Sequence, residues 1–287
     1  PIDAMTHSPN IAPTLPSTVV AQGMWEASGK AAPPKLGQGR IMLSAAAEQT
    51  FVFSYVEDFR VDFTGKRLGE WYNLNLLDRV PKVNGAVPLH PAHYDFLESH
   101  LYYKSGAQFG PALLDFLSVA WFSSGQNAIE WMPRTNYLPF LTAGQRPLFA
   151  SPEQTLEAIT ANDFNPRSVV YLPDTSRARI SVSKNVDCTV TNAQFSAHKI
   201  EAEVSSPEPT MLVVSQTYYH LWQAYVDCIS VPLFRANVAF QALEVPAGKH
   251  QVKIVYRDHN FSFGALLTAI SLGLCGLLWW KSPQIPT

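Results

Sequence analysis

The chain has 287 residues, 47% of them hydrophobic and 15% charged, which is enough for one large or two ordinary domains with a substantial core. Its net charge of −2 provides no basic surface of the kind that binds nucleic acid, so we expect no nucleic-acid partner. Three cysteines are too few for a disulfide framework, although Cys188 and Cys228 could form one bridge if the domain lies outside the cytoplasm.

Residues 1–36 contain six of the 22 prolines and show no regular hydrophobic period. This composition is typical of irregular chain, so we expect a Pro-rich lead-in. The sequence begins at Pro1 rather than at a methionine, and no apolar run near its start resembles a signal peptide. We therefore expect either a tail-anchored protein or a piece of a longer polytopic chain.

Residues 37–163 show mixed periodicity, which predicts a small mixed α/β unit. The clearest helix begins after Ser151, a favourable N-cap residue, with Pro152 at the first helical position and Gln154 completing a capping box. The expected strands lie at residues 40–43, 118–123 and 128–132, and the expected helices at 111–117 and 152–161.

Residues 164–258 show a different hydrophobicity pattern, because short β-like runs follow one another at intervals of about 8–12 residues. The alternation of apolar and polar residues is clearest in Ile200–Val204 and Val252–Tyr256. The expected strands are 169–172, 178–183, 188–193, 199–204, 211–218, 224–226, 231–235, 238–245 and 252–257. This pattern predicts an antiparallel β-sandwich, and the fold class of the whole chain is α+β.

The run from Phe263 to Trp280 contains no charged residue. As a helix it would be about 27 Å long, enough to cross the hydrocarbon core of a bilayer. Trp279 and Trp280 lie where an interfacial aromatic belt is usually found. We expect a transmembrane helix over residues 261–281 with the lipid bilayer as its partner, followed by a short tail at 282–287. The alternative is a buried core helix.

A cluster of histidines and acids is a candidate metal site. His90, His93 and Asp95 could ligate a divalent metal, with Glu98 and His100 nearby. Pro91 argues against presenting these side chains from a helix, and no second histidine pair supports the cluster. We therefore expect an ordinary surface loop here and no metal site.

A second group of charges could supply an acid pair for sugar chemistry, since glycosyl transfer needs a base to orient the acceptor hydroxyl. These charges alternate with apolar residues from Val56 to Phe63, which favours a half-exposed strand with a structural role. The group consists of Glu57, Asp58, Arg60, Asp62 and Glu70.

Aromatic residues gather in the last third of the chain, together with planar hydrogen-bonding side chains. This composition suits a glycan cleft, because sugars bind through aromatic faces and a few hydrogen bonds. The alternative is that the aromatic side chains fill the sandwich core. The candidate glycan-binding residues are Tyr218, Tyr219, Trp222, Tyr225, Asp227 and Arg235.

Several motifs carry a resemblance to a known family. Met211–Trp222, Ala224–Asp227, Val231–Asn237 and Val245–Val252 match, in order and spacing, the C-terminal region of the YfhO-like bacterial membrane proteins. The resemblance covers residues 40–281 and is strongest from Asp163 onward. One departure is Cys228, where the family usually carries a glycine after the aspartate of a tight turn; a turn needing positive φ would be strained there.

The resemblance implies a many-helix membrane protein similar to C-type (GT-C) glycosyltransferases, which take sugars from polyprenyl-phosphate carriers on the outer face of the bacterial cytoplasmic membrane. This chain would be the extracytoplasmic accessory domain and last membrane helix, with the upstream membrane helices and either a glycan or a polyprenyl-linked sugar as partners. The catalytic carboxylate of such enzymes usually lies in the first outer loop, so no residue here inherits a catalytic role, and we expect no cofactor. The alternative is a membrane-anchored structural or interaction domain without sugar-related activity.

Overall fold

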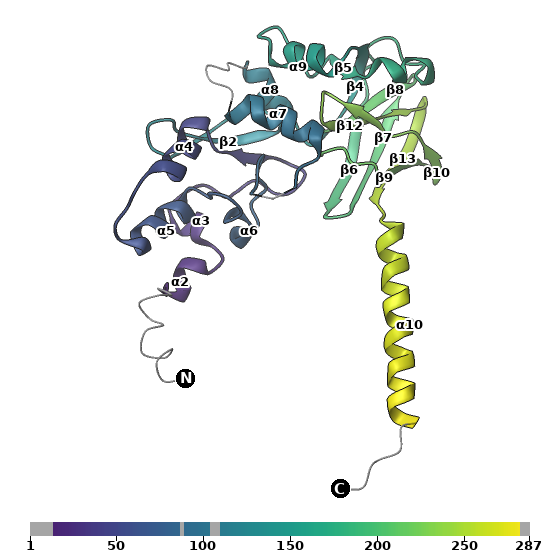
Figure 1. The fold of residues 1–287 in the computed structure, drawn as a ribbon. Coiled ribbons are helices and arrows are strands. Elements are labelled where there is room, and N and C mark those ends of the chain that lie inside the picture. Colours follow the sequence, from purple (N-terminus) through teal and green to yellow (C-terminus); the bar gives the residue numbers. More distant parts are fainter. Residues whose placement is uncertain (1–13, 87–88, 104–109, 282–287) are drawn as a thin grey trace.

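The computed structural model describes residues 14–86, 89–103 and 110–281. Its N-terminal part is built on a small sheet of order β1-β2-β3, in which β1 and β2 are parallel and β2 and β3 antiparallel. The strands are β1 (Arg40–Met42), β2 (Val119–Ser123) and β3 (Trp131–Pro133). The surrounding helices are α2 (Ser17–Val20), α3 (Met24–Ala27), α4 (Ala45–Phe53), α5 (Phe59–Leu68), α6 (Asn75–Asp78), α7 (Ala92–Tyr102) and α8 (Pro111–Phe116) (Figure 1).

The expected Pro-rich lead-in contributes to the core of this part. Residues 1–13 lie outside the described residues, but Trp25 on α3 is buried and packs against Trp121 and Trp131. A carboxylate far along the chain holds α3 in place: Asp78 accepts hydrogen bonds from the backbone N–H groups of Gly23 at 2.7 Å and Trp25 at 2.9 Å. This anchoring was not apparent from the sequence, because it joins residues more than 50 positions apart.

Two local expectations for this part were wrong. The segment around residues 56–63 is not a strand, because Asp58 caps helix α5 by accepting a hydrogen bond from the Arg60 N–H at 2.8 Å. The segment after Pro91 is not a loop, because α7 begins at the next residue. Proline fits there, since a residue that precedes the first helical turn makes no intrahelical N–H bond.

The second part consists of two five-stranded sheets that pack face to face. The first has the order β10-β9-β13-β7-β6 and is antiparallel throughout. The second has the order β11-β12-β8-β4-β5 and is antiparallel except for the pair β4–β5. The strands are β4 (Leu141–Phe149), β5 (Val169–Leu172), β6 (Thr189–Ser196), β7 (Lys199–Ser206), β8 (Thr210–Val214), β9 (Trp222–Val226), β10 (Ile229–Val231), β11 (Phe234–Ala236), β12 (Phe240–Val245) and β13 (Gly248–Tyr256).

Helix α9 (Pro152–Thr160) connects the parallel pair β4–β5. Its capping box is formed as predicted: Ser151 accepts from the N–H of Gln154, whose side chain accepts from the N–H of Ser151. Strand β4 precedes residue 164, so the second sheet includes a strand from the segment that was expected to belong to the mixed unit.

Three expected strands differ in the structure. Residues 178–183 do not form a strand, and a 3₁₀ helix, η1 (Asp174–Arg179), overlaps their beginning. The run 231–235 is divided between β10 and β11 in different sheets, with Pro232 at the break because proline cannot donate to a strand ladder. Strand β8 ends at Val214, which frees the residues that follow to line a cleft.

The sheet that contains β8 is the middle layer of the molecule, and all five residues of β8 are buried. Leu212 and Val214 face the partner sheet, whereas Met211 and Val213 belong to a second cluster shared with helices α7, α8 and α9. This alternation is expected for a strand that is covered on both faces.

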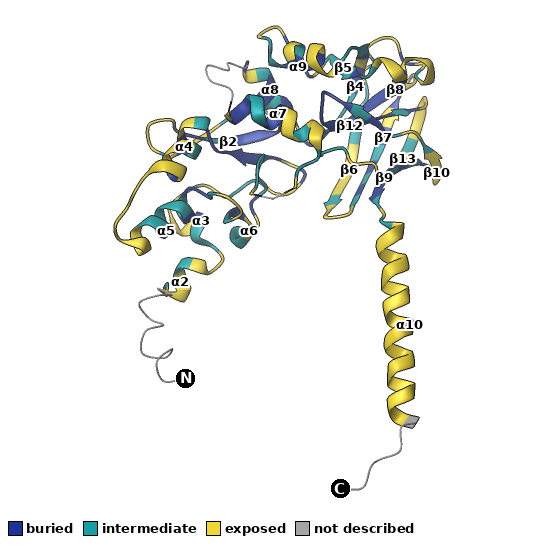
Figure 2. Ribbon diagram, viewed as in Figure 1, coloured by how far each residue is buried: buried dark blue, intermediate teal, exposed yellow. Residues whose placement is uncertain are grey.

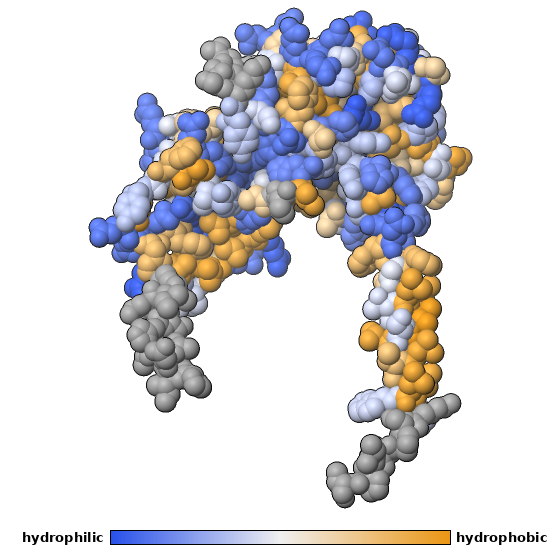
Figure 3. All heavy atoms as spheres, viewed as in Figure 1, coloured by the Kyte–Doolittle hydropathy of each residue, from blue (hydrophilic) through white to orange (hydrophobic). Residues whose placement is uncertain are grey.

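Helix α10 (His259–Lys281) follows β13 almost immediately and extends away from the rest of the chain (Figure 1). Asp258 caps it by accepting a hydrogen bond from the Phe261 N–H at 2.9 Å. Its surface is exposed along its length and largely apolar (Figures 2 and 3). Among the described residues it is the one helix long and apolar enough to cross a membrane, and it is not a buried core helix.

Candidate functional site

A cleft of about 680 Å³ lies where the two parts of the molecule meet. One wall comes from α6 and the loop that follows it, up to Gly85. The other wall comes from residues 216–222 and from Tyr256 at the end of β13. Arg40, Tyr94 and Phe140 complete the lining. The cleft is therefore assembled from segments far apart in the sequence.

The charges along this cleft are of one sign. Its lining includes four basic residues and no aspartate or glutamate among the described residues; the basic residues are Arg40, Arg79, Lys82 and His90. The chain as a whole has 23 acidic and 21 Lys and Arg residues, so composition alone would not produce such a lining. The cleft favours ligands that are negatively charged or rich in hydrogen-bond acceptors.

Arg40 is buried at the inner end of the cleft. Its guanidinium donates to the carbonyl oxygen of Leu117 at 3.0 Å and to the hydroxyl and carbonyl oxygens of Ser215 at 3.0 and 2.5 Å, and it lies 3.6 Å from the ring centroid of Phe140. Burial lowers the pKa of Arg40 to about 10, so the side chain stays charged at neutral pH.

Lys82 lines the same cleft and is also removed from solvent, with 1% of its side chain exposed. Its ammonium donates to the carbonyl oxygens of Glu70 at 2.9 Å and Tyr72 at 3.1 Å, with the nearest carboxylate oxygen, of Glu48, 3.9 Å away. Burial lowers the pKa of Lys82 to about 8, against the opposing effect of the nearby acids. The charge of Lys82 therefore changes within an accessible pH range.

The outer end of the cleft is aromatic. Tyr219 and Tyr256 are stacked, with their ring centroids 6.3 Å apart, and Trp222 meets Tyr256 edge-on at 5.5 Å. Tyr219 is 39% exposed, so part of its ring is open to a ligand. Gln216 and Asn84 line the same cleft, and the Asn84 amide oxygen, which has no hydrogen-bond partner among the described residues, can accept from a hydroxyl group.

Of the six residues expected to bind a glycan, the structure brings Tyr219 and Trp222 to this cleft. Tyr225 lies on β9, where its hydroxyl donates to Gln223 at 2.9 Å. Asp227 lies in the β9–β10 turn and pairs with His250 at 2.6 Å.

The remaining two residues also lie outside the cleft lining. Arg235 is on β11, and its guanidinium contacts the imidazole of His93. Tyr218 is half-buried and is held through its backbone N–H, which donates to the Ala239 carbonyl at 2.7 Å.

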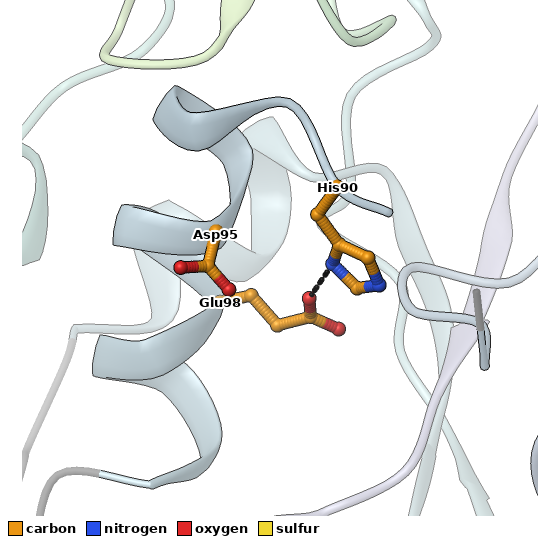
Figure 4. Close-up of side chains that lie close together, drawn as sticks. All are labelled: His90, Asp95 and Glu98. Atoms are coloured by element: carbon orange, nitrogen blue, oxygen red, sulfur yellow. Dashed lines mark ion pairs between the residues drawn. The ribbon is translucent and has the colours of Figure 1, made fainter. Parts of the chain in front are cut away.

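The histidine–acid cluster forms with different members than expected. Helix α7 brings Asp95 and Glu98 next to His90, and the potential ligand atoms of the three lie within 4.8 Å of one another, whereas His93 turns to Arg235 (Figure 4). The set of donors suits a divalent cation. His90 and Glu98 already form an ion pair at 2.7 Å, so the cluster has a sufficient structural role without a metal.

The expected acid pair is dispersed. Asp58 caps α5, Asp62 pairs with Lys66 at 2.7 Å on the surface, and Glu70 is buried beside Arg67. Burial raises the pKa of Glu70 to about 7, even though Arg67 opposes this shift. These acids stabilise the N-terminal part rather than forming a common site.

The three cysteines are free thiols, so Cys188 and Cys228 do not form a bridge. Cys228 follows Asp227 in the two-residue turn between β9 and β10, with φ values of 69° and 48°. The turn does require positive φ where this sequence has cysteine, as the departure from the family pattern indicated.

Sequence reasoning missed the two cations at the inner end of the cleft. Arg40 opens the apolar run Arg40–Leu43, and Lys82 stands alone between Pro81 and Val83. An isolated charge within an apolar segment is the available signal, since such residues are rarely buried without a partner. It does not reveal that the two residues line the same cleft.

A family model matches part of the chain. Residues 163–268 match the family model described as "Bacterial membrane protein YfhO", a range that covers β5 to β13 and the beginning of α10. No curated protein matches the chain. Residues 163–268 are therefore a domain of the YfhO bacterial membrane protein family, followed directly by the remainder of a helix suited to crossing a membrane.

Proposed function

We propose that this chain is the extracytoplasmic accessory domain and last membrane helix of a polytopic glycosyltransferase-like protein. The donor would be a polyprenyl-phosphate sugar and the acceptor a cell-envelope glycan. The segment itself is non-catalytic, and its cleft holds the glycan or the lipid-linked sugar close to the membrane.

The aromatic end of the cleft carries this proposal. Trp222 and Tyr219 provide ring faces for a sugar, and Tyr256 beside them is the last residue of β13, so the ring cluster stands next to the start of α10. A volume of about 680 Å³ is within the range of small-molecule sites. The family match and the spanning helix support a position at the membrane surface.

Binding of glycans tests the proposal directly. The full chain in nanodiscs is titrated with fragments of cell-envelope glycans by isothermal titration calorimetry. We expect Trp222→Ala to weaken binding about tenfold through the loss of ring contact, and Tyr225→Ala to leave it unchanged because that tyrosine lies outside the cleft lining. No binding to any glycan would leave the alternative, a membrane-anchored interaction domain.

The side of the membrane is tested with the exposed thiol of Cys228. With Cys188 and Cys275 replaced by alanine, a membrane-impermeant maleimide should label Cys228 on intact cells that produce the complete protein. Labelling only after permeabilisation would place the domain in the cytoplasm and exclude the glycosyltransferase reading. The proposed cytoplasmic tail, residues 282–287, lies outside the described residues.

A further inference from the structure

The inner end of the cleft contains a buried cation that lacks a carboxylate partner. No acid of the described chain lies within ion-pairing distance of Arg40, which is 9% exposed. The other buried arginine behaves differently, because Arg67 pairs with Glu70 at 3.2 Å and Asp78 at 2.7 Å. Its hydrogen bonds to Leu117 and Ser215 are to neutral groups, so an anionic ligand would supply the counter-charge that the described chain does not give Arg40.

Neighbouring groups point to the same kind of partner. A chamber of about 120 Å³ opens at this end, and Arg40, Lys82, Gln216 and Thr217 all line it. Arg79, on the wall of the larger cleft, is exposed and forms no ion pair with a described residue. A buried guanidinium, a second one at the wall and neutral hydrogen-bonding groups suit an oxyanion, since arginine binds phosphate oxygens through several N–H groups.

We propose that the inner end of this cleft binds the phosphate group of a phosphate-bearing ligand through Arg40, with Arg79 attracting it from the wall. This inference rests on the proposed function in one respect: the cleft is a ligand site whose aromatic end receives the remainder of the ligand. The chamber has room for a group of a few heavy atoms, and the larger cleft for an attached organic group. The phosphate can belong to a soluble ester or to a membrane-borne lipid.

The experiment uses the full chain in zwitterionic nanodiscs, titrated with glycerophosphoglycerol by isothermal titration calorimetry. This phosphodiester carries one negative charge at neutral pH. We expect Arg40→Gln to weaken binding about 10- to 100-fold, by the loss of charge-assisted hydrogen bonds. Because Arg40 also ties β1 to Ser215, Arg79→Gln is the second variant and should weaken binding several-fold without affecting folding. Arg60→Gln, on the surface of α5 and outside the cleft, is the control and should have no effect.

A lipid arm separates the two sources of phosphate. Polyprenyl phosphate incorporated into the nanodisc should raise the apparent Kd of glycerophosphoglycerol if the lipid occupies the chamber, and leave it unchanged if the ligand is soluble. Absence of binding by both phosphates would overturn the inference, as would unchanged affinity in folded Arg79→Gln and Arg40→Gln. Neutral glycans that still bind in a Trp222-dependent manner would then show that the proposed function stands without a phosphate subsite.

Discussion

The buried ion cluster of Arg67, Glu70 and Asp78, the last residue of α6, gives the most quantitative prediction, for the variant Asp78→Ala. Asp78 pairs with the guanidinium of Arg67 at 2.7 Å and accepts the N–H groups of Gly23 and Trp25, and the side chains of Asp78 and Arg67 are 3% and 0% exposed. Breaking a buried pair from one side typically costs about 3–5 kcal/mol, since it leaves an uncompensated charge. Glu70 still pairs with Arg67 at 3.2 Å, so we expect a loss near the lower end, about 3 kcal/mol.

The free energy of unfolding is measured by urea titration of the full chain in detergent micelles, followed by tryptophan fluorescence. The signal reports mainly on the N-terminal part, which holds four of the seven tryptophans, namely Trp25, Trp71, Trp121 and Trp131. Asp62→Ala is the matched control, because it removes a partly exposed ion pair and should cost at most about 1 kcal/mol. Equal losses for the two variants would refute the conclusion that the buried cluster anchors α3 and the α6 wall of the cleft.

Three further predictions concern the β-sandwich. Cys228→Gly should raise stability by about 1 kcal/mol by relieving the residue at φ 69°, whereas Cys228→Ala should not; equal effects in thermal unfolding would contradict this. Gly144→Ala should destabilise by about 2 kcal/mol or more, because φ is 100° and the new Cβ would collide with the Val186 carbonyl oxygen; an unchanged urea midpoint would show that the bulge in β4 adapts. Hydrogen bonding to Asp227 raises the pKa of His250 above 6.5, so the stabilising contribution of this pair is present below pH 6.5 and is lost as the pH rises through the raised value. His250→Gln should abolish the corresponding fall in Tm with pH. A fall that persists in this variant would be due to another group.

Elements with a clear local signal could be predicted from the sequence. The alternation in Ile200–Val204, the capping box at Ser151 and the apolar run from Phe263 each led to the correct element, because each depends on neighbours along the chain. Strand β4 was missed because Gly144 and Pro147 interrupt its pattern, and its place is set by pairing with β8 and β5.

The helix α5 was missed for a related reason. Phe59 and Phe63 are spaced for one face of a helix, but with Val61 between them they also fit the alternation of a strand. The capping aspartate Asp58 decides between the two, and in the sequence it was counted among the charges of a half-exposed strand.

The site was less accessible to sequence reasoning than the fold. Tyr219 and Trp222 belong to one short segment, so their shared position was predictable from a local pattern. Arg40 and Lys82 are more than 40 residues apart, and Ser215, which fixes Arg40, is 175 positions away from it. Only the assembled fold places these residues along one cleft, so their shared position is a property of tertiary contacts.

Because the joint between β13 and α10 is short, a change in the tilt of α10 is transmitted to the cleft. Only Arg257 and Asp258 separate the strand from the helix, and the cap at Asp258 stiffens the first turn. A membrane helix changes its tilt when the thickness of the surrounding bilayer changes. Because Tyr256 is both the last residue before this joint and part of the cleft wall, such a tilt rotates the mouth of the cleft relative to the lipid surface. The composition of the bilayer would thus set which membrane-borne groups reach the cleft, with no change in the cleft's own side chains.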